Sequence, residues 1–272
     1  FYIAGDYERA IEAGKAAVEK DPNNLKAHYC LGRTYYKIGE FKLALEHMKK
    51  AESLTSDKED LMHIYNWLGM IYGRMGYLDD ALLYYSRSLS LARHLGNRNM
   101  QILVLNNVAV IYQDKGELDK ALSYYEEILR LQTGEREKVA SYNNIATIYY
   151  KKDNYQKAVE YFQKAIEISE RYGYYHEASI IKLNLGNKYR KTKDYEKAER
   201  YLLEGLEGVK RVGDKYSEAT GYVYLGLLYR DKGDKKTAKD YFTRAYDLFK
   251  SIGAEGKAEE VLSAIRELEK KR

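Results

Sequence analysis

Residues 104–129, VLNNVAVIYQDKGELDKALSYYEEIL, contain the pattern that decides the fold of this chain. Before Gly116, apolar side chains recur at helical spacing, as at Val108 and Tyr112, and the same spacing resumes after it from Ala121. Glycine at a helix end supplies the left-handed backbone conformation that terminates a helix. The stretch therefore predicts two helices joined by a tight turn.

The same pattern returns along the whole chain. An apolar residue is followed by Gly or Ala, then by Tyr three positions later, and an Ala stands twelve positions beyond each Gly or Ala. The small residues of the first set are Gly32, Gly69, Ala109, Ala146, Gly186 and Gly226, and those of the second are Ala44, Ala81, Ala121, Ala158, Ala198 and Ala238. Successive units begin 37 or 40 residues apart. A period of this length is typical of stacked helical repeats.

The small residues have a packing explanation. Two helices that cross closely leave no room for a long side chain at the contact. We therefore expect each Gly or Ala of the first set to face the Ala of the second set, with the Tyr filling the space beside the crossing. Replacing Ala121 by Leu should cost roughly 1–3 kcal/mol through overpacking.

These landmarks, with Gly-Asp or Gly-Glu turns and the Asp21-Pro22 that follows an expected helix over residues 6–20, resemble the tetratricopeptide repeat. The resemblance implies an all-α fold, a right-handed superhelical solenoid of antiparallel helix pairs. The spacing near 40 exceeds the usual repeat of about 34 residues. It is similar to the longer-helix subgroup of kinesin light chains, Pins-type polarity scaffolds and the bacterial MalT and Rap regulators.

The register predicts an array over residues 1–253 and a C-terminal capping helix over residues 254–272. A partial first repeat spans residues 1–22, where Phe1 takes the place of the Tyr and Gly5 that of the turn. Six complete repeats begin near residues 25, 62, 102, 139, 179 and 219. Because the partial repeat lacks its first helix, we expect a further element before Phe1 in a longer parent protein.

Composition narrows the class of function. The 46 basic and 41 acidic residues give a net charge of +5, but they intermix along the expected helix faces, whereas nucleic-acid binding favours a concentrated basic stripe. One cysteine, Cys30, allows no internal disulfide and fits a reducing, cytoplasmic location. No apolar run reaches the roughly 18 residues of a membrane span. Abundant Tyr, Lys and Glu favour a thermophilic source.

The sequence shows none of the patterns that accompany catalysis. The five histidines are scattered and have no metal-ligand spacing with Cys30. The glycines punctuate helix ends instead of forming a phosphate-binding loop before a helix. We therefore predict no catalytic residue, no metal site and no cofactor.

Asparagines recur on the first helices, at positions that the register places on the concave side of the array. Asn favours helices weakly, so its recurrence there calls for an explanation. Its amide offers a donor and an acceptor, which match the two backbone groups of an extended peptide. The predicted set is Asn66, Asn106, Asn107, Asn143, Asn144, Asn184 and Asn187. The alternative is that these amides bond between neighbouring helices and only stiffen the stack.

Two further kinds of side chain accompany these asparagines. Lys151 and Arg190 lie further along the same helices and would attract a carboxylate or an acidic segment. Alternatively, they are charged residues that suit the C-terminal ends of helices. Trp67 offers an apolar anchor for a ligand, or else a packing residue.

We interpret the chain as a scaffold or adaptor that binds an extended peptide or a partner protein in the concave groove. No nucleic acid and no membrane partner are expected. One alternative is a regulatory sensor domain of a larger signalling or transcription protein, which responds to a peptide or a small effector. Another is a structural spacer that associates with itself.

Overall fold

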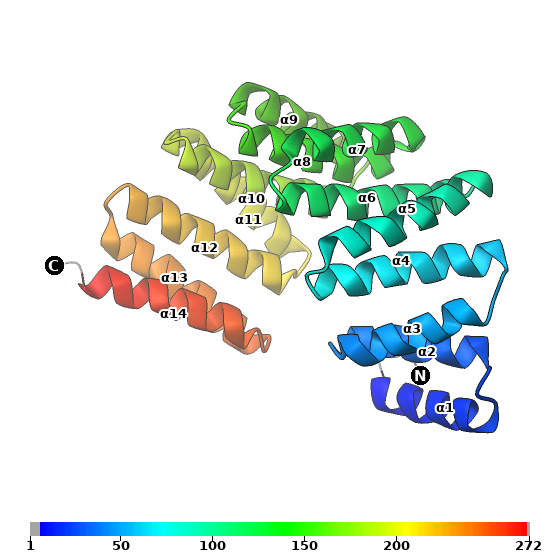
Figure 1. Cartoon of the computed structure of the whole chain (residues 1–272). Coiled ribbons are helices and arrows are strands. Elements are labelled where there is room, and N and C mark those ends of the chain that lie inside the picture. Colours follow the sequence, from blue (N-terminus) through cyan, green and yellow to red (C-terminus); the bar gives the residue numbers. More distant parts are fainter. Residues whose placement is uncertain (1–5, 271–272) are drawn as a thin grey trace. The chain divides into compact units, whose positions relative to one another are not determined.

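The computed structural model describes residues 6–270, and every regular element in this range is an α-helix, as predicted (Figure 1). Within each compact part of the chain, neighbouring helices run antiparallel and form the expected helix pairs. The chain divides into two compact units, residues 1–131 and 132–272. Phe1 and Gly5, to which the sequence assigned landmark roles, lie outside the described residues.

The first unit consists, in its described part, of one leading helix followed by three helix pairs. These helices are α1 (Tyr7–Lys20), α2 (Leu25–Lys37), α3 (Phe41–Ser53), α4 (Lys58–Arg74), α5 (Leu78–His94), α6 (Arg98–Asp114) and α7 (Leu118–Leu131). Its core gathers apolar side chains from α2 to α5, including Leu31, Met48 and Leu68, all of which are fully buried.

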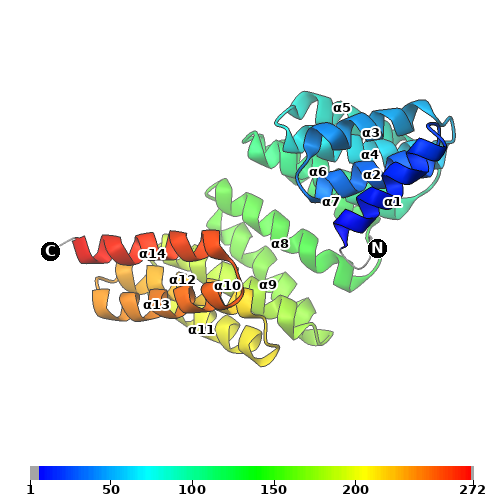
Figure 2. The ribbon, with the colours of Figure 1, turned by 90° about the horizontal axis from the view of Figure 1, so that it is seen from below.

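The second unit contains three helix pairs and a final helix. These are α8 (Glu135–Lys151), α9 (Tyr155–Arg171), α10 (Tyr175–Lys191), α11 (Tyr195–Arg211), α12 (Lys215–Asp231), α13 (Lys235–Ser251) and α14 (Glu255–Lys270). Figure 2 shows α14 beside the last pair, and Ala258, Val261 and Ile265 of α14 are buried in the core that α10 to α13 form. The C-terminal segment therefore is a capping helix, as predicted.

Side chains at the helix starts explain where the helices begin. The carboxylate of Asp214 accepts a hydrogen bond from the backbone N–H of Ser217 at 3.0 Å, and Asn154 caps α9 through the N–H of Lys157 at 3.2 Å. Such caps satisfy backbone donors that have no partner inside the helix. Asx residues thus fix the first turn of α1, α2, α4, α6, α9, α11, α12 and α13, whereas α3, α5, α8 and α10 begin without a side-chain cap.

The turns before these caps require a left-handed residue. Gly233, like the other connector glycines, has a positive φ, +86° at this residue. Asp153 and Lys193 occupy the corresponding positions in two connectors and also have positive φ, 58° and 65°. Residues other than glycine adopt this conformation at a cost of about 1–2 kcal/mol. These two connectors are therefore strained in comparison with their glycine counterparts.

The two sets of small residues meet as the packing argument predicts. Ala121 is fully buried, as are the other alanines of its set. A Cβ atom added to Gly186 would lie 3.0 Å from the carbonyl oxygen of Ala198, and one added to Gly226 would lie 2.6 Å from the ring of Phe242. The helices of a pair can approach this closely only because these positions are small.

The tyrosines that stand three positions after the small residues of the first set stack on aromatic rings of the second helices. Tyr189 of α10 lies on Tyr201 of α11, with ring centroids 5.6 Å apart and an angle of 12° between the rings. The same parallel stack recurs in four other pairs, namely Tyr72–Tyr84, Tyr112–Tyr124, Tyr149–Tyr161 and Tyr229–Tyr241. Tyr therefore serves as a packing residue beside each crossing.

Candidate functional site

The helices that begin each pair in the second unit, α8, α10 and α12, together with α14, form what we call the first-helix face. The asparagines and basic residues predicted for this half of the chain all lie on α8 or α10. Asn143, Asn144, Asn184 and Asn187 are each partly exposed. Because they are partly exposed, a ligand on this face could contact at least part of each side chain.

Asn143 lies in a pocket between α8 and α10. The pocket has a volume of about 270 Å³ and is lined mainly by apolar side chains, among them Val139, Ile180 and Ile181. The side-chain oxygen of Asn143 is buried and has no hydrogen-bond partner among the described residues. A buried acceptor without a partner costs roughly 1–3 kcal/mol, so a donor from a ligand would be stabilised here.

The neighbouring residues of this pocket carry charge. The guanidinium of Arg136 lies 4.9 Å from the centre of the Tyr174 ring, and its Nη2 is 3.7 Å from a carboxylate oxygen of Glu177. The aromatic ring and the carboxylate together place the cation at the edge of the pocket. The pocket therefore combines an apolar lining with one amide and one charged pair.

Asn187 and Arg190 are bound to each other inside the face. The Nε of Arg190 donates to the side-chain oxygen of Asn187 at 3.0 Å, and its Nη1 donates to the carboxylate of Asp231 on α12. The side-chain amide of Asn187 also lies close enough to the hydroxyl of Tyr224 on α12 to act on its pKa, which burial raises overall. Only 9% of Arg190 is exposed. These two residues connect α10 to α12, which corresponds to the stiffening alternative.

A basic cluster stands at the C-terminal ends of α8 and α10. Burial lowers the pKa of Lys188, and the ammonium groups of Lys191 and Lys151 lower it further. The Nζ of Lys188 lies 4.5 Å from the centre of the Tyr150 ring. None of the three lysines has an ion-pair partner within residues 6–270. An anionic group that binds at this cluster would be attracted by the three ammonium groups and would reduce the repulsion among them.

Sequence analysis did not single out Lys188. It identified Lys151 because that residue stands at the C-terminal end of α8. Lys188 instead stands one turn before the C-terminal end of α10. The only signal in the sequence was its place three residues before Lys191. That spacing puts the two lysines on the same side of α10.

The first unit places its predicted residues differently. The side-chain amide of Asn107 donates to the side-chain oxygen of Asn66 at 3.2 Å, which links α6 to α4, and Asn66 is 4% exposed. Trp67 donates through its ring N–H to the hydroxyl of Tyr29 at 3.0 Å. Asn106 is partly exposed and follows Leu105 on the same helix. In this unit Asn66, Trp67 and Asn107 thus contact their own neighbours.

A pocket in the first unit lies between α2 and α4. It has a volume of about 320 Å³, and Lys26, His63 and Asp60 are among its lining residues. Within residues 6–270, no group of three or more His, Cys, Asp or Glu side chains is arranged to hold a metal ion. None of the described helices has both the length and the hydrophobicity needed to cross a bilayer.

Comparison with known proteins identifies the repeat. Tetratricopeptide repeat profiles match residues 60–134, 137–211 and 177–251, and two further profiles of this repeat match residues 1–39 and 25–58. The chain belongs to the tetratricopeptide repeat family. A TPR repeat-containing protein of Methanocaldococcus jannaschii is 33% identical over 91 residues, which are 34% of this chain and 15% of the relative. The aligned segment is therefore a small part of that protein.

Solved structures of tetratricopeptide repeat type show the same fold. The apo form of RapI is 20% identical with a TM-score of 0.69, and the alignment covers 90% of this chain and 97% of RapI. The apo form of the quorum sensor NprR from B. thuringiensis is 20% identical with a TM-score of 0.67, covering 98% of this chain and 84% of NprR. The predicted likeness in fold to Rap-type proteins is confirmed. A tetratricopeptide repeat fold supports protein interaction.

Proposed function

We propose that the chain is a scaffold that binds an extended segment of a partner protein along the first-helix face of the second unit. The observation that carries this proposal is the buried side-chain oxygen of Asn143, which has no partner among the described residues and belongs to a pocket of that face. A backbone N–H of a bound peptide would supply the missing donor.

Asn144 and Asn184 extend this proposed contact along the face. Both are partly exposed, one on α8 and one on α10, and each amide can pair with a backbone N–H and a backbone carbonyl of a ligand. Asn187 and Arg190, in contrast, hold α10 against α12 and give the face a fixed shape. A fixed face lowers the entropy that binding must overcome.

The basic cluster gives the proposed ligand a charge preference. Lys151, Lys188 and Lys191 have no acidic partner in the described chain, so a carboxylate that binds beside them is not in competition with an internal ion pair. Such a preference would act on the rate of encounter and on specificity more than on total affinity. We therefore expect ligands with an acidic residue near one end.

Selection of peptides from a random twelve-residue phage library on the full chain tests this proposal. We expect the selected peptides to lose about ten-fold or more in affinity for the Asn144→Ala/Asn184→Ala variant, since each lost hydrogen bond contributes roughly 0.5–1.5 kcal/mol. Gln163→Ala, which removes an exposed amide on the second helix α9, is the matched control and should bind normally. Equal affinity for all three proteins would refute the proposal.

The alternative function is a regulatory sensor domain of a larger signalling or transcription protein. The likeness in fold to the quorum sensor NprR favours this alternative. Small-angle scattering with and without a selected peptide separates the two functions. A scaffold keeps its radius of gyration when the peptide binds, whereas a sensor changes it. A spacer that associates with itself would instead gain mass with concentration and without any ligand.

A further inference from the structure

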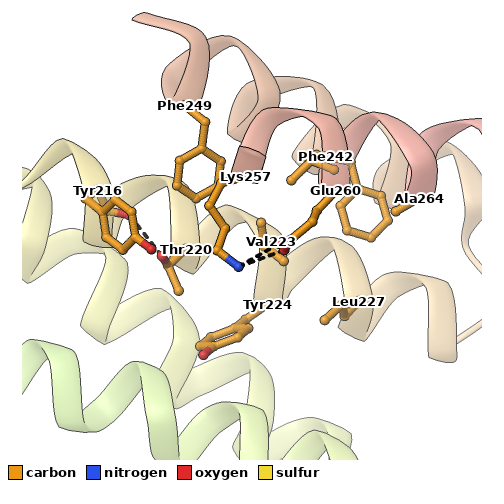
Figure 3. Close-up of a pocket in the computed structure, with 11 residues that line it drawn as sticks. Tyr216, Thr220, Val223, Tyr224, Leu227, Phe242, Phe249, Lys257, Glu260 and Ala264 are labelled. Atoms are coloured by element: carbon orange, nitrogen blue, oxygen red, sulfur yellow. Dashed lines mark hydrogen bonds and ion pairs between the residues drawn. The ribbon is translucent and has the colours of Figure 1, made fainter. Parts of the chain in front are cut away.

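A pocket of about 540 Å³ lies between α12 and α14, at the C-terminal end of the first-helix face. Figure 3 shows Tyr216 and Tyr224 of α12 on one side of this pocket and Lys257 and Glu260 of α14 on the other. Phe242 of α13 contributes to its lining and is itself fully buried. Its size and its largely aromatic and aliphatic lining are typical of a ligand-binding pocket.

α14 carries a larger residue than α12 at one position of this face. Eight residues after the connector glycine, α12 has Gly221, and a Cβ atom there would lie 3.2 Å from the side chain of Leu183 on α10. α10 therefore packs directly against α12. The corresponding residue of α14 is Val261, a larger side chain that lines the pocket, and α14 packs mainly on α13. The space between α12 and α14 stays open.

The rim of this pocket is electrically balanced. The ammonium of Lys257 donates to both carboxylate oxygens of Glu260, at 3.0 and 2.7 Å (Figure 3). The hydroxyl of Thr220 donates to the backbone carbonyl of Tyr216, so its hydrogen is also engaged. A charged side chain that entered would lose water and would find no uncompensated charge of the opposite sign. The lining therefore suits an uncharged side chain.

The pocket is continuous with the proposed peptide-binding face. Tyr224 lines the pocket with its ring, and its hydroxyl lies near Asn187 of α10. Tyr224 therefore joins the pocket to the part of the first-helix face that α10 forms. A peptide main chain that passes Asn184 and Asn187 would reach this pocket next along the face.

We propose that the pocket between α12 and α14 receives one large uncharged side chain, aromatic or long aliphatic, of the peptide that binds the first-helix face. This inference rests on the proposed function. It identifies the pocket as the part of the face that selects the sequence of the bound peptide. Burial of such a side chain contributes about a ten- to hundred-fold gain in affinity over a small polar residue at the same place. Tyr216 and Tyr224 would contact an aromatic ring edge to face.

The test uses the same random twelve-residue library, selected in parallel on the full chain and on Ala264→Trp. Ala264 lines the pocket, so a tryptophan there fills it, whereas Ser263→Trp adds the same side chain at the adjacent exposed position as the control. We expect peptides selected on the wild type and on Ser263→Trp to share Trp, Phe, Leu or Met at one position. Ala264→Trp should bind these peptides ten- to hundred-fold more weakly. Thr220→Trp fills the pocket from α12 and repeats the test if the first variant does not fold.

The outcomes separate this inference from the proposed function. Peptides that depend on Asn144 and Asn184 but show no apolar preference, or that bind Ala264→Trp normally, would leave the function standing and overturn the inference. Failure to select any peptide would overturn both. Concentration-dependent dimerisation of the wild type that Ala264→Trp abolishes would assign the pocket to a second copy of the chain and would also overturn the inference.

Discussion

Among the described glycines, Gly205 has the closest backbone atoms around a would-be side chain and should tolerate alanine poorly. Gly205 of α11 faces α10, where an added Cβ atom would lie 2.7 Å from the carbonyl oxygen of Ser179 and 2.9 Å from the backbone nitrogen of Leu183. Neither atom can move without moving α10. The perturbation we consider is Gly205→Ala, which adds one methyl group to a helix that should otherwise gain from it.

Two effects of opposite sign decide the result. Alanine favours a helix over glycine by about 1 kcal/mol. Overpacking typically costs 1–3 kcal/mol, and the upper end applies because the contacted atoms are backbone. We therefore expect Gly205→Ala to lower the free energy of unfolding by roughly 2 kcal/mol. For a unit of this size, that corresponds to a fall in melting temperature of about 4–8 °C.

The assay is urea and thermal unfolding followed by circular dichroism, with Gly256→Ala as the matched control. Gly256 of α14 is exposed, and a Cβ atom there would meet nothing within 4 Å. Only the helix preference remains at that position, so Gly256→Ala should raise stability by up to about 1 kcal/mol. If Gly205→Ala were neutral or stabilising as well, α10 and α11 would not cross as closely as described.

Three further predictions concern the connectors, acid stability and the asparagine pair. Lys193→Gly should raise the free energy of unfolding in urea by about 0.5–1 kcal/mol, because it removes a lysine from the left-handed backbone region. Gly233→Ala should lower that free energy, and equal effects of the two substitutions would contradict the strain argument. Burial acts to raise the pKa of Asp214, but hydrogen bonds from Ser217 and then His176 outweigh it and lower the pKa to about 2. This stabilisation is therefore present above the ordinary carboxyl value near 4 and is lost as pH falls through 2, so thermal melts of Asp214→Asn should lose less stability than wild type between pH 4 and 2. Asn66→Ala and Asn107→Ala should each cost about 1 kcal/mol and couple by about 0.5–1 kcal/mol in a double-mutant cycle, whereas strict additivity would show that they do not interact.

The parts of the fold that depend on backbone packing were predictable from the sequence. A position where two helices cross accepts only Gly or Ala, so Gly186 and Ala198 mark the crossing without any knowledge of the surroundings. Connector glycines mark helix ends for a similar reason, since few other residues adopt a positive φ. Lys193, which breaks this rule, lies between the small residues Gly186 and Ala198 of one repeat, so the repeat spacing alone places it in a connector, and Asp194 then caps the next helix.

The partners of the asparagines could not be predicted in the same way. Asn107 and Asn144 occupy equivalent positions in their repeats, yet Asn107 bonds to Asn66 while Asn144 is free to face a ligand in our proposal. Which amide finds an internal partner depends on the residue that the preceding first helix presents, and on its rotamer. The register of one helix does not contain that information.

Two larger features also had no clear signal in the sequence. The chain divides into two units at Leu131, where α7 ends after 14 residues and is shorter than most other helices. The pocket between α12 and α14 is lined by Val261, where α12 has Gly221 at the corresponding position. The sequence predicts a capping helix over residues 254–272, which accounts for the burial of Val261 but not for the open space beside it.

The central claim is that amides on the first-helix face of the second unit hold the backbone of a bound peptide. Nuclear magnetic resonance of the side-chain amides, in protein labelled with ¹⁵N at asparagine, tests it most directly when a library-selected peptide is added. The account predicts that the signals of Asn143, Asn144 and Asn184 shift on binding, while that of Asn154, which caps α9, stays in place. Saturation with peptide that leaves the signals of Asn143, Asn144 and Asn184 unmoved would contradict it.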